Sequence, residues 1–327
     1  MHAGWYERTG PAEEVIRTGE MEAPKPAPGE VLVRVHASGI NPSDYKRRAN
    51  TKVAAEFPRV IPHSDGAGVV AALGAGASGF REGDRVWAYN AQWQRAFGTA
   101  AEFVSLPARL VRPLPQATSF VEGACLGIPA MTGYHAVHVA GPVQGKTVYV
   151  PGATGRVGAY AVQFAKWRGA RVIASTGGGE QSRAAIAALG ADLVLDRKAA
   201  DLEARLMAET GGKGVDHIVE VDLPGNIAFD ERILGERGAI VSFGAASSPS
   251  VPVTQMGRRA RNMGLHFILV YLLDAPTFAA TCAGIEEAAQ AGVLKHRIGG
   301  TFPLRELARA HRTAETTTGT GHMVVEI

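Results

Sequence analysis

The sequence predicts an α/β protein of two domains, in which a doubly wound parallel sheet is inserted into a domain rich in β-strands. Up to about residue 115, short alternating strand patterns are interrupted by Gly and Pro, which is typical of an all-β, barrel-like unit. From residue 120 onward, strand and helix patterns alternate, which predicts parallel strands with helices on both faces. The length of 327 residues independently favours two domains.

These patterns place the elements in chain order. In the first domain, residues 1–120, strands are predicted at 30–36, 68–72 and 84–88. The second domain, residues 121–262, is predicted to hold strands at 147–150, 171–175, 193–195, 217–221 and 239–243, and helices at 159–169, 181–189 and 202–210. The chain then returns to the first domain over residues 263–327, with a buried apolar strand at 266–273, an alanine-rich helix at 276–290 and a final strand at 322–327.

Composition excludes several classes of protein. Hydrophobic residues make up 46% and charged residues 20%, as in a globular protein with a large core. The net charge of +3 makes nucleic acid an unlikely partner, and the Arg258, Arg259 and Arg261 cluster is interpreted as solvated surface. Cys125 and Cys282 lack motif spacing, and no signal peptide or membrane-spanning stretch is evident. We therefore expect a cytoplasmic protein.

A glycine-rich turn is the most informative feature of the chain. Residues 148–158 read VYVPGATGRVG, so a short β-branched run ends in glycines and a helical pattern follows at once. Ala153, Gly155 and Gly158 occupy the three small-residue positions of the G-x-G-x-x-G pattern. In that strand–turn–helix context the glycines let a pyrophosphate approach the backbone at a helix N-terminus. The turn therefore predicts a dinucleotide-binding Rossmann domain.

The end of the following strand indicates which dinucleotide binds. NAD enzymes carry an acidic residue there to hold the ribose hydroxyls, whereas this chain has Ser175 and Thr176 followed by three glycines. No carboxylate would repel a 2′-phosphate, and the hydroxyls of Ser175 and Thr176 could donate to one. Arg183 and Arg197 lie downstream as candidate cationic partners, although either could equally be an ordinary surface residue. Together these residues favour NADPH.

Several motifs taken together resemble a known family over essentially the whole chain. They are His36-Ala-Ser-Gly-Ile-Asn-Pro-Ser-Asp44, Ile61-Pro-His-Ser-Asp-Gly-Ala-Gly-Val69, Gly83-Asp-Arg-Val86, Gly98-Thr-Ala-Ala-Glu-Phe103, Gly127-Ile-Pro129 with Thr132, Gly152–Gly158 and Gly319-Thr-Gly-His-Met-Val324. The chain resembles the zinc-free quinone oxidoreductase (zeta-crystallin-like) branch of the medium-chain dehydrogenase/reductase superfamily. The resemblance implies a Rossmann domain inserted in a β-rich GroES-like partial barrel.

The resemblance also implies cofactor contacts. Lys46 falls near the nicotinamide, the turn from Thr154 through Gly155 and Arg156 to Val157 holds the pyrophosphate, and Gly177 and Arg197 flank the adenosine ribose and its phosphate. The remaining implied cofactor residues are Thr132, Asn226, Phe243, Gly244, Ala245 and Ala246, the last five on the nicotinamide side, and Phe267, Ile268 and Leu269 near the carboxamide. The chain departs from the family pattern at Arg156, which replaces a glycine, at His322, which replaces a lysine, and at Lys46, where tyrosine is common.

No metal is expected. Two cysteines cannot build the Cys₄ lobe of the zinc alcohol dehydrogenases, and Asn41-Pro42-Ser43 stands where a catalytic Cys would be. His63 and Asp65, with the more distant Asp44, make a poor zinc site without a thiolate.

Without a Lewis acid, the chemistry is limited to acceptors that accommodate the incoming charge themselves, such as quinones and activated alkenes. Asn41, Tyr45 and Lys46 are candidates for polarising the acceptor oxygen, with Asp44 orienting them. A purely structural role is about equally well supported for Asn41, as a loop cap, and for Tyr45, as packing. Trp93 could stack on a flat acceptor or pack beneath its own loop.

The leading functional hypothesis is NADPH-dependent quinone reduction. The alternatives are reduction of activated alkenes, such as enones or 2-substituted acrylates, and, from another class, an NADPH-binding structural or RNA-binding protein with little turnover. The apolar segment 266–272 is predicted to lie at a sheet edge and to pair chains into a homodimer or homotetramer.

Overall fold

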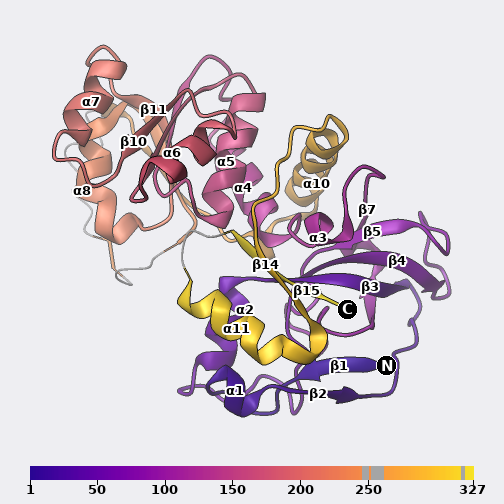
Figure 1. The fold of residues 1–327 in the computed structure, drawn as a ribbon. Coiled ribbons are helices and arrows are strands. Elements are labelled where there is room, and N and C mark those ends of the chain that lie inside the picture. Colours follow the sequence, from indigo (N-terminus) through magenta and orange to yellow (C-terminus); the bar gives the residue numbers. More distant parts are fainter. Residues whose placement is uncertain (245–249, 252–260, 318–320) are drawn as a thin grey trace. The chain divides into compact units, whose positions relative to one another are not determined.

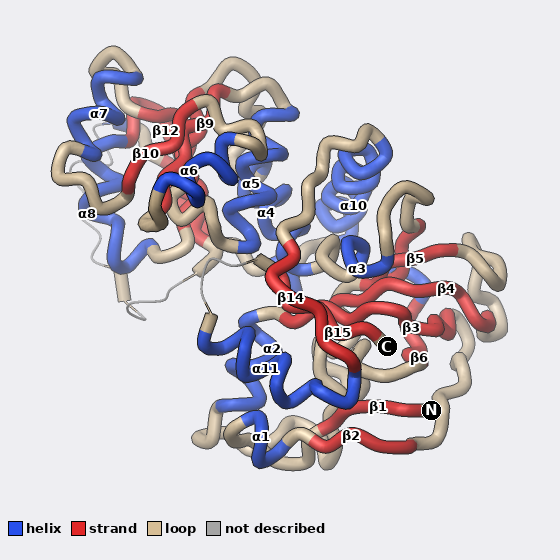
Figure 2. Tube along the Cα trace, in the orientation of Figure 1, coloured by secondary structure: helices blue, strands red, loops and turns tan. Residues whose placement is uncertain are grey.

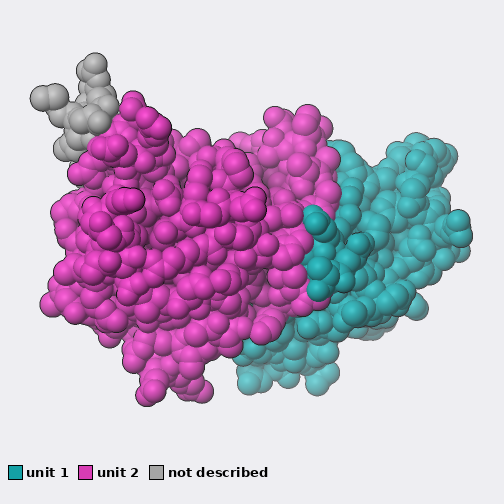
Figure 3. All heavy atoms as spheres, turned by 90° about the horizontal axis from the view of Figure 1, so that it is seen from above, with its two compact units in different colours: residues 1–129, 285–291, 296–327 teal, residues 130–284, 292–295 magenta. Residues whose placement is uncertain are grey.

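The computed structural model describes all residues except 245–249, 252–260 and 318–320. The chain forms two compact units (Figures 1 and 3). Unit 1 comprises Met1–Pro129, Ile285–Ala291 and His296–Ile327, and unit 2 comprises Ala130–Gly284 and Gly292–Lys295. Unit 2 is therefore inserted into unit 1, and the predicted α/β class is confirmed.

Unit 2 is built on a parallel sheet of six strands. Their order across the sheet is β10 (Leu193–Asp196), β9 (Arg171–Thr176), β8 (Thr147–Val150), β11 (Val215–Glu220), β12 (Leu234–Ser242) and β13 (Gly264–Phe267). Numbered along the chain, this is the order 3-2-1-4-5-6 of a dinucleotide-binding fold, in which ligands bind beyond the carboxyl ends of the strands. The helices are α4 (Ile128–His138), α5 (Arg156–Trp167), α6 (Glu180–Ala187), α7 (Leu202–Glu209), α8 (Leu223–Ile233) and α10 (Ala275–Gln290) (Figure 2).

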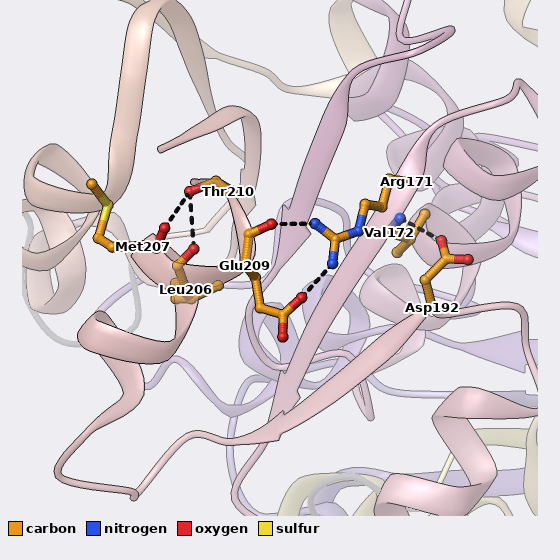
Figure 4. Close-up of polar contacts among 7 residues, drawn as sticks. All are labelled: Arg171, Val172, Asp192, Leu206, Met207, Glu209 and Thr210. Atoms are coloured by element: carbon orange, nitrogen blue, oxygen red, sulfur yellow. Dashed lines mark hydrogen bonds and ion pairs between the residues drawn. The ribbon is translucent and has the colours of Figure 1, made fainter. Parts of the chain in front are cut away.

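The strands of unit 2 are apolar on both faces because helices cover the sheet. One core cluster joins Tyr149, Ile173 and Ile218 of the strands with Leu206 of α7 and Ile227 of α8. Polar contacts at the amino end of β9 tie this strand to the end of α7 (Figure 4). The Arg171 guanidinium binds the carbonyl and carboxylate of Glu209, and the Thr210 hydroxyl donates to two carbonyls at the end of α7.

Unit 1 contains a seven-stranded sheet and a separate hairpin-like pair, β1 (His2–Trp5) with β2 (Arg17–Glu20). The larger sheet runs β14 (Ile298–Pro303), β15 (His322–Glu326), β3 (Glu30–Ile40), β4 (Asp65–Leu73), β5 (Arg85–Ala88) and β7 (Val111–Pro113), with β6 (Phe103–Pro107) also paired to β3. Its helices are α1 (Ala12–Val15), α2 (Pro42–Ala49), α3 (Phe120–Gly123) and α11 (Leu307–Thr316). The C-terminal strand β15 thus lies inside the sheet, between β14 and β3.

The sequence pattern predicted a buried strand at 266–273, but the structure differs there. β13 ends at Phe267 and a short 3₁₀ turn, η2 (Val270–Leu272), follows. The side chains of Phe267, Leu269 and Leu272 are 67%, 51% and 67% exposed. The exposure follows from position, because among the described strands β13 is the last of its sheet and pairs with β12 alone.

The pairing of β13 with β12 also places the second domain boundary later in the chain than the sequence pattern predicted. The sequence pattern placed the return to the first domain at residue 263, but β13 pairs with β12 and stays in unit 2. The chain returns at Ile285, within α10. Among the described residues, no helix is long and apolar enough to cross a bilayer.

Candidate functional site

The glycine-rich turn of unit 2 joins β8 to α5. Gly152 has a φ of +63°, a left-handed conformation that favours glycine, and Gly155 is the N-cap of α5. A Cβ on Gly158 would lie 2.9 Å from the carbonyl oxygen of Gly152 and 3.0 Å from Cα of Ala153. A larger residue at Gly158 would therefore push the helix away from the turn, as the third glycine of the pattern requires. Thr154, Arg156 and Val157 are half-buried at the same turn.

Two cations lie at the carboxyl end of β9. A Cβ on Gly177 would be 3.5 Å from Cε of Lys198 and 3.9 Å from Nε of Arg197. Both long side chains are exposed, whereas Arg183 is half-buried on α6. Lys198 was missed by the sequence reasoning, although it directly follows Arg197 at the end of a predicted strand. An anion above Gly177 would be within reach of both Arg197 and Lys198.

The structure corrects the predicted role of Ser175. Its side chain is fully buried, and its hydroxyl is hydrogen-bonded to the Tyr149 hydroxyl at 2.7 Å. Thr176 is also buried, and its hydroxyl accepts from the backbone N–H of Gly178. Both faces of β9 are covered, so the Ser175 hydroxyl is enclosed on a face of the sheet. It therefore cannot donate to a phosphate beyond the carboxyl end of the strand.

A pocket of about 480 Å³ lies in unit 2, beyond the ends of β8, β10 and β11 and against α7 and α8. Arg197 and Asn226 both line it, so Asn226 lies in the same pocket as the residue expected to hold the adenosine phosphate. The family resemblance had implied that Asn226 lies on the nicotinamide side of the coenzyme. The other lining residues are Tyr149, Pro151, Lys198, Ala199, Ala200, Leu202, Glu203, Glu220, Phe229, Asp230 and Arg232.

The residues implied for the nicotinamide lie after β12 and β13. Phe243 donates its backbone N–H to the carbonyl of Glu220, and a Cβ on Gly244 would lie only 2.3 Å from the carbonyl oxygen of Val221. Ile268 donates its backbone N–H to Ser242. Thr132 is buried on α4. Ala245 and Ala246 lie outside the described residues.

The candidate catalytic residues belong to unit 1, at the start of α2. Asn41 is 2% exposed, and its side-chain N–H donates to Oδ2 of Asp65 at 2.7 Å. Its backbone N–H donates to Oδ2 of Asp44 at 2.7 Å, so Asp44 holds the main chain of Asn41. The backbone N–H of Ile128 also donates to Asp65. Burial raises the pKa of the Asp65 carboxyl well above its ordinary value, opposed by the hydrogen bonds from Asn41 and Ile128.

The other candidates in unit 1 are less enclosed. Tyr45 is half-buried against a hydrophobic cluster, which favours its structural interpretation, and Lys46 is exposed. The Trp93 ring is contacted by the Arg47 guanidinium, 5.6 Å from the ring centroid. Arg47 also donates to the side chain of Gln92 at 2.6 Å. The sequence reasoning missed Arg47, whose only signal was its place next to Lys46.

The two candidate zinc ligands His63 and Asp65 are both hydrogen-bonded to other residues of unit 1. Both ring nitrogens of His63 are hydrogen-bonded, Nδ1 with Ser38 Oγ at 2.7 Å and Nε2 with Nε2 of His311 at 2.9 Å. Asp65 Oδ2 is occupied by Asn41 and Ile128. With no thiolate at Asn41, this donor set does not fit a zinc site.

The His63 contacts form a chain of hydrogen bonds with one direction. The Thr99 hydroxyl donates to the carbonyl of Asp65 at 2.6 Å, so it accepts from Ser38, and Ser38 in turn accepts from Nδ1–H of His63. Nε2 of His63 must therefore accept from Nε2–H of His311, so the His63 imidazole is neutral. Burial lowers the pKa of His63 to about 3 and that of His311 well below its ordinary value.

Comparison with known proteins assigns the family. The family model "Alcohol dehydrogenase GroES-like domain" matches residues 27–116, and "Zinc-binding dehydrogenase" matches residues 157–302. The chain is 32% identical to the quinone oxidoreductase of Rattus norvegicus, over 94% of this chain and 91% of that protein. It is 31% identical to the 2-methylene-furan-3-one reductase of Solanum lycopersicum, over 60% of this chain and 52% of that protein. A mycobacterial protein solved in complex with NADPH is 28% identical, with all of both chains covered and a TM-score of 0.84.

The fold and these matches define an enzyme of the medium-chain dehydrogenase/reductase superfamily. Within that superfamily, the chain belongs to the zeta-crystallin-like quinone oxidoreductase branch. The resemblance drawn from the sequence motifs is therefore confirmed, and so is the assignment to this class of oxidoreductase.

Proposed function

We propose that this enzyme reduces quinones with NADPH and without zinc. Bound NADPH supplies a hydride from C4 of its nicotinamide. The glycines at 155 and 158 support close approach of the pyrophosphate to the turn, and the N-terminus of α5 offers it backbone N–H groups and a partial positive charge. The pocket lined by Arg197 and Asn226 is the proposed site of the adenosine half.

The observation that carries the choice of NADPH is the pair of cations beside Gly177. Arg197 and Lys198 approach the end of β9 from the loop after β10, and that end carries no carboxylate. A 2′-phosphate there would gain charge-assisted hydrogen bonds, whereas the ribose hydroxyls of NADH would find no acidic partner.

Binding of the hydride acceptor is proposed to depend mainly on Asn41. One of its two side-chain N–H groups donates to Asp65, which fixes the amide plane, and the other is proposed to bind the acceptor oxygen. Lys46 is the second proposed donor, while Asp44 positions Asn41 and Tyr45 packs beside it. A quinone stabilises the incoming charge itself, so this set suffices without a Lewis acid. Trp93, already covered by Arg47, is proposed to border the acceptor.

A second candidate is reduction of activated alkenes. The similarity to a 2-methylene-furan-3-one reductase favours it, because an enone is also flat and electron-poor. One panel separates the two: NADPH consumption with quinones, enones and 2-substituted acrylates, each with and without a zinc chelator. We expect turnover with quinones to exceed that with alkenes and to survive chelation. Loss of turnover on chelation, or no NADPH consumption with any acceptor, would overturn the proposal.

We also propose that the protein is cytoplasmic and forms a homodimer or homotetramer. The exposed Phe267 ends an edge strand and the exposed Leu269 and Leu272 follow it, and apolar surface in that position is typically covered by a second chain. Light scattering at micromolar concentration tests this, and a stable monomer would contradict it.

A further inference from the structure

The guanidinium of Arg47, on α2, is held in place by three neighbours in unit 1. It lies over the Trp93 ring, 5.6 Å from the ring centroid, and its Nη1 donates to Oε1 of Gln92 at 2.6 Å. Nη1 also lies 3.5 Å from Oε2 of Glu56. Gln92 is 3% exposed, and its own side-chain N–H donates to the carbonyl of Arg95 at 3.0 Å. The partner of Nη1 is therefore fixed, and so is the orientation of the guanidinium.

The opposite edge of this guanidinium, formed by Nε and Nη2, is open. Among the described residues, the polar contacts of the Arg47 side chain are made by Nη1, and neither Nε nor Nη2 has a partner. Neither atom is fully buried, and the side chain is 28% exposed, so a solute can reach this edge. Nε–H and Nη2–H of an arginine are parallel donors that match the two oxygens of a carboxylate. Arg47 therefore presents an oriented bidentate site for a planar anion.

Arg59 shows the same arrangement with this edge occupied. It lies over another tryptophan, 5.2 Å from the ring centroid of Trp5, and it also pairs with a glutamate. Its Nε and Nη2 both donate to Oε1 of Glu7, at 2.8 and 2.6 Å. A partner within the fold thus fills at Arg59 the edge that stays open at Arg47.

The charge around the open edge is positive. Lys46 precedes Arg47 on α2 and is exposed, so the two residues bring two neighbouring cations. Among the described residues, the carboxylate paired with either of them is Glu56, which is itself 43% exposed. The acid on the same helix, Asp44, is buried and bonded to the backbone N–H of Asn41. The excess of positive charge favours an anion at this position.

We propose that Arg47 determines acceptor specificity, by binding a carboxylate substituent of the acceptor through Nε and Nη2. Arg47 follows Asn41 by six residues, which is about 9 Å along α2. The carboxylate therefore belongs on the part of the acceptor remote from the oxygen that Asn41 binds. The substrate class is a flat, electron-poor acceptor with an acidic substituent. The inference rests on the proposed function, because it takes Asn41, Lys46 and Trp93 to border the acceptor.

The test compares two acceptors that differ in this charge: a naphthoquinone with a carboxylate on its outer ring, and the methyl ester of the same compound. The quantity measured is the acid-to-ester ratio of kcat/KM, with NADPH saturating. Arg47→Met keeps an apolar chain over Trp93 but removes the bidentate donor. We expect it to lower the ratio about 10- to 100-fold through a higher KM for the acid, while kcat and KM for the ester stay within about twofold.

Three further variants complete the design. Arg47→Lys keeps the charge without the parallel donors and is expected to give an intermediate ratio. Glu56→Gln removes the carboxylate that competes for the guanidinium and is expected to raise the ratio about two- to fivefold, so the test does not depend on one variant folding. Arg59→Met is the matched control, since it removes a stacked guanidinium whose edge is already occupied, and it should leave the ratio unchanged.

The failure of this inference and that of the proposed function give different results. If the wild type consumes NADPH with neither compound, the proposed function fails. If it reduces both, but Arg47→Met lowers kcat/KM for the ester as much as for the acid, Arg47 only tethers the loop that carries Trp93 and the specificity role is overturned. A ratio that stays unchanged in both Arg47→Met and Glu56→Gln overturns it as well. A fall in the first variant together with a rise in the second would support it.

Discussion

The buried His63–His311 pair predicts that unit 1 loses stability in mild acid. The ordinary pKa of His63 is 6.5, and burial lowers it to about 3 in the folded protein. Between pH 6.5 and about pH 3, His63 is protonated in the unfolded chain but stays neutral in the folded protein. The free energy of unfolding therefore falls as the pH decreases through this range. One pKa unit corresponds to about 1.36 kcal/mol, so the decrease from pH 6.5 to pH 5 costs about 2 kcal/mol for His63 alone.

The perturbation is to remove the titrating groups. His63 has a φ of +79°, which Asn tolerates better than most residues, so His63→Asn is the first substitution and His311→Gln the second. Both lose hydrogen bonds and destabilise the protein at neutral pH, by about 1–3 kcal/mol each. The informative quantity is the further decrease between pH 7.5 and pH 5, which we expect to be smaller in the double variant than in the wild type by about 2 kcal/mol or more.

The assay is urea unfolding followed by tryptophan fluorescence. Trp5, Trp87 and Trp93 lie in unit 1, so the signal reports mainly on the unit that contains the pair. His217 and His296, whose pKa values burial lowers to about 4, contribute equally to all the proteins. An equal acid-induced decrease in the wild type and the double variant would refute the reasoning.

Three other predictions concern the proposed coenzyme and acceptor sites. Gly158→Val forces a side chain against the carbonyl of the turn, and we expect it to destabilise unit 2 by about 1–3 kcal/mol and to abolish NADPH binding in calorimetry; wild-type affinity would contradict this. The double variant Arg197→Ala/Lys198→Ala should raise the dissociation constant of NADPH about 10- to 100-fold and leave that of NADH nearly unchanged, and equal losses for both would argue against a 2′-phosphate at Gly177. Asn41→Ala should lower kcat with a quinone on the order of 10²-fold while NADPH affinity is retained, and an unchanged kcat would remove Asn41 from the chemistry.

The parts of the fold that sequence predicts well are those with local signals. The strand–turn–helix at residues 148–158 combines β-branched residues, a left-handed Gly152 and the small residue at Gly158, all within a few positions of one another. Strand β3 is predicted because its alternation reflects one buried face, and its pairing with β4 follows chain order.

The contacts that sequence could not predict join distant residues. Ser175 was expected at the phosphate but bonds to Tyr149, because a strand covered on both faces carries no alternation to show which way a small polar side chain points. The Asn41–Asp65 contact depends on the packing of separate elements, to which no local pattern corresponds. The apolar run after β12 was expected to be a buried strand because hydrophobicity alone does not show whether an apolar segment lies in the core or at the surface.

The position of β15 has a consequence for how the protein is made. This strand lies between β14 and β3 of unit 1, whereas the main segment of unit 2, Ala130–Gly284, precedes it in the chain and is synthesised before it. A nascent chain can therefore complete most of unit 2 while the first 129 residues still lack β14 and β15 of their sheet. A chain that stops before β15 would leave one side of β3 unpaired and would deprive β14 of its partner strand, so segments from both sides of unit 2 must be present together before the sheet of unit 1 can be completed.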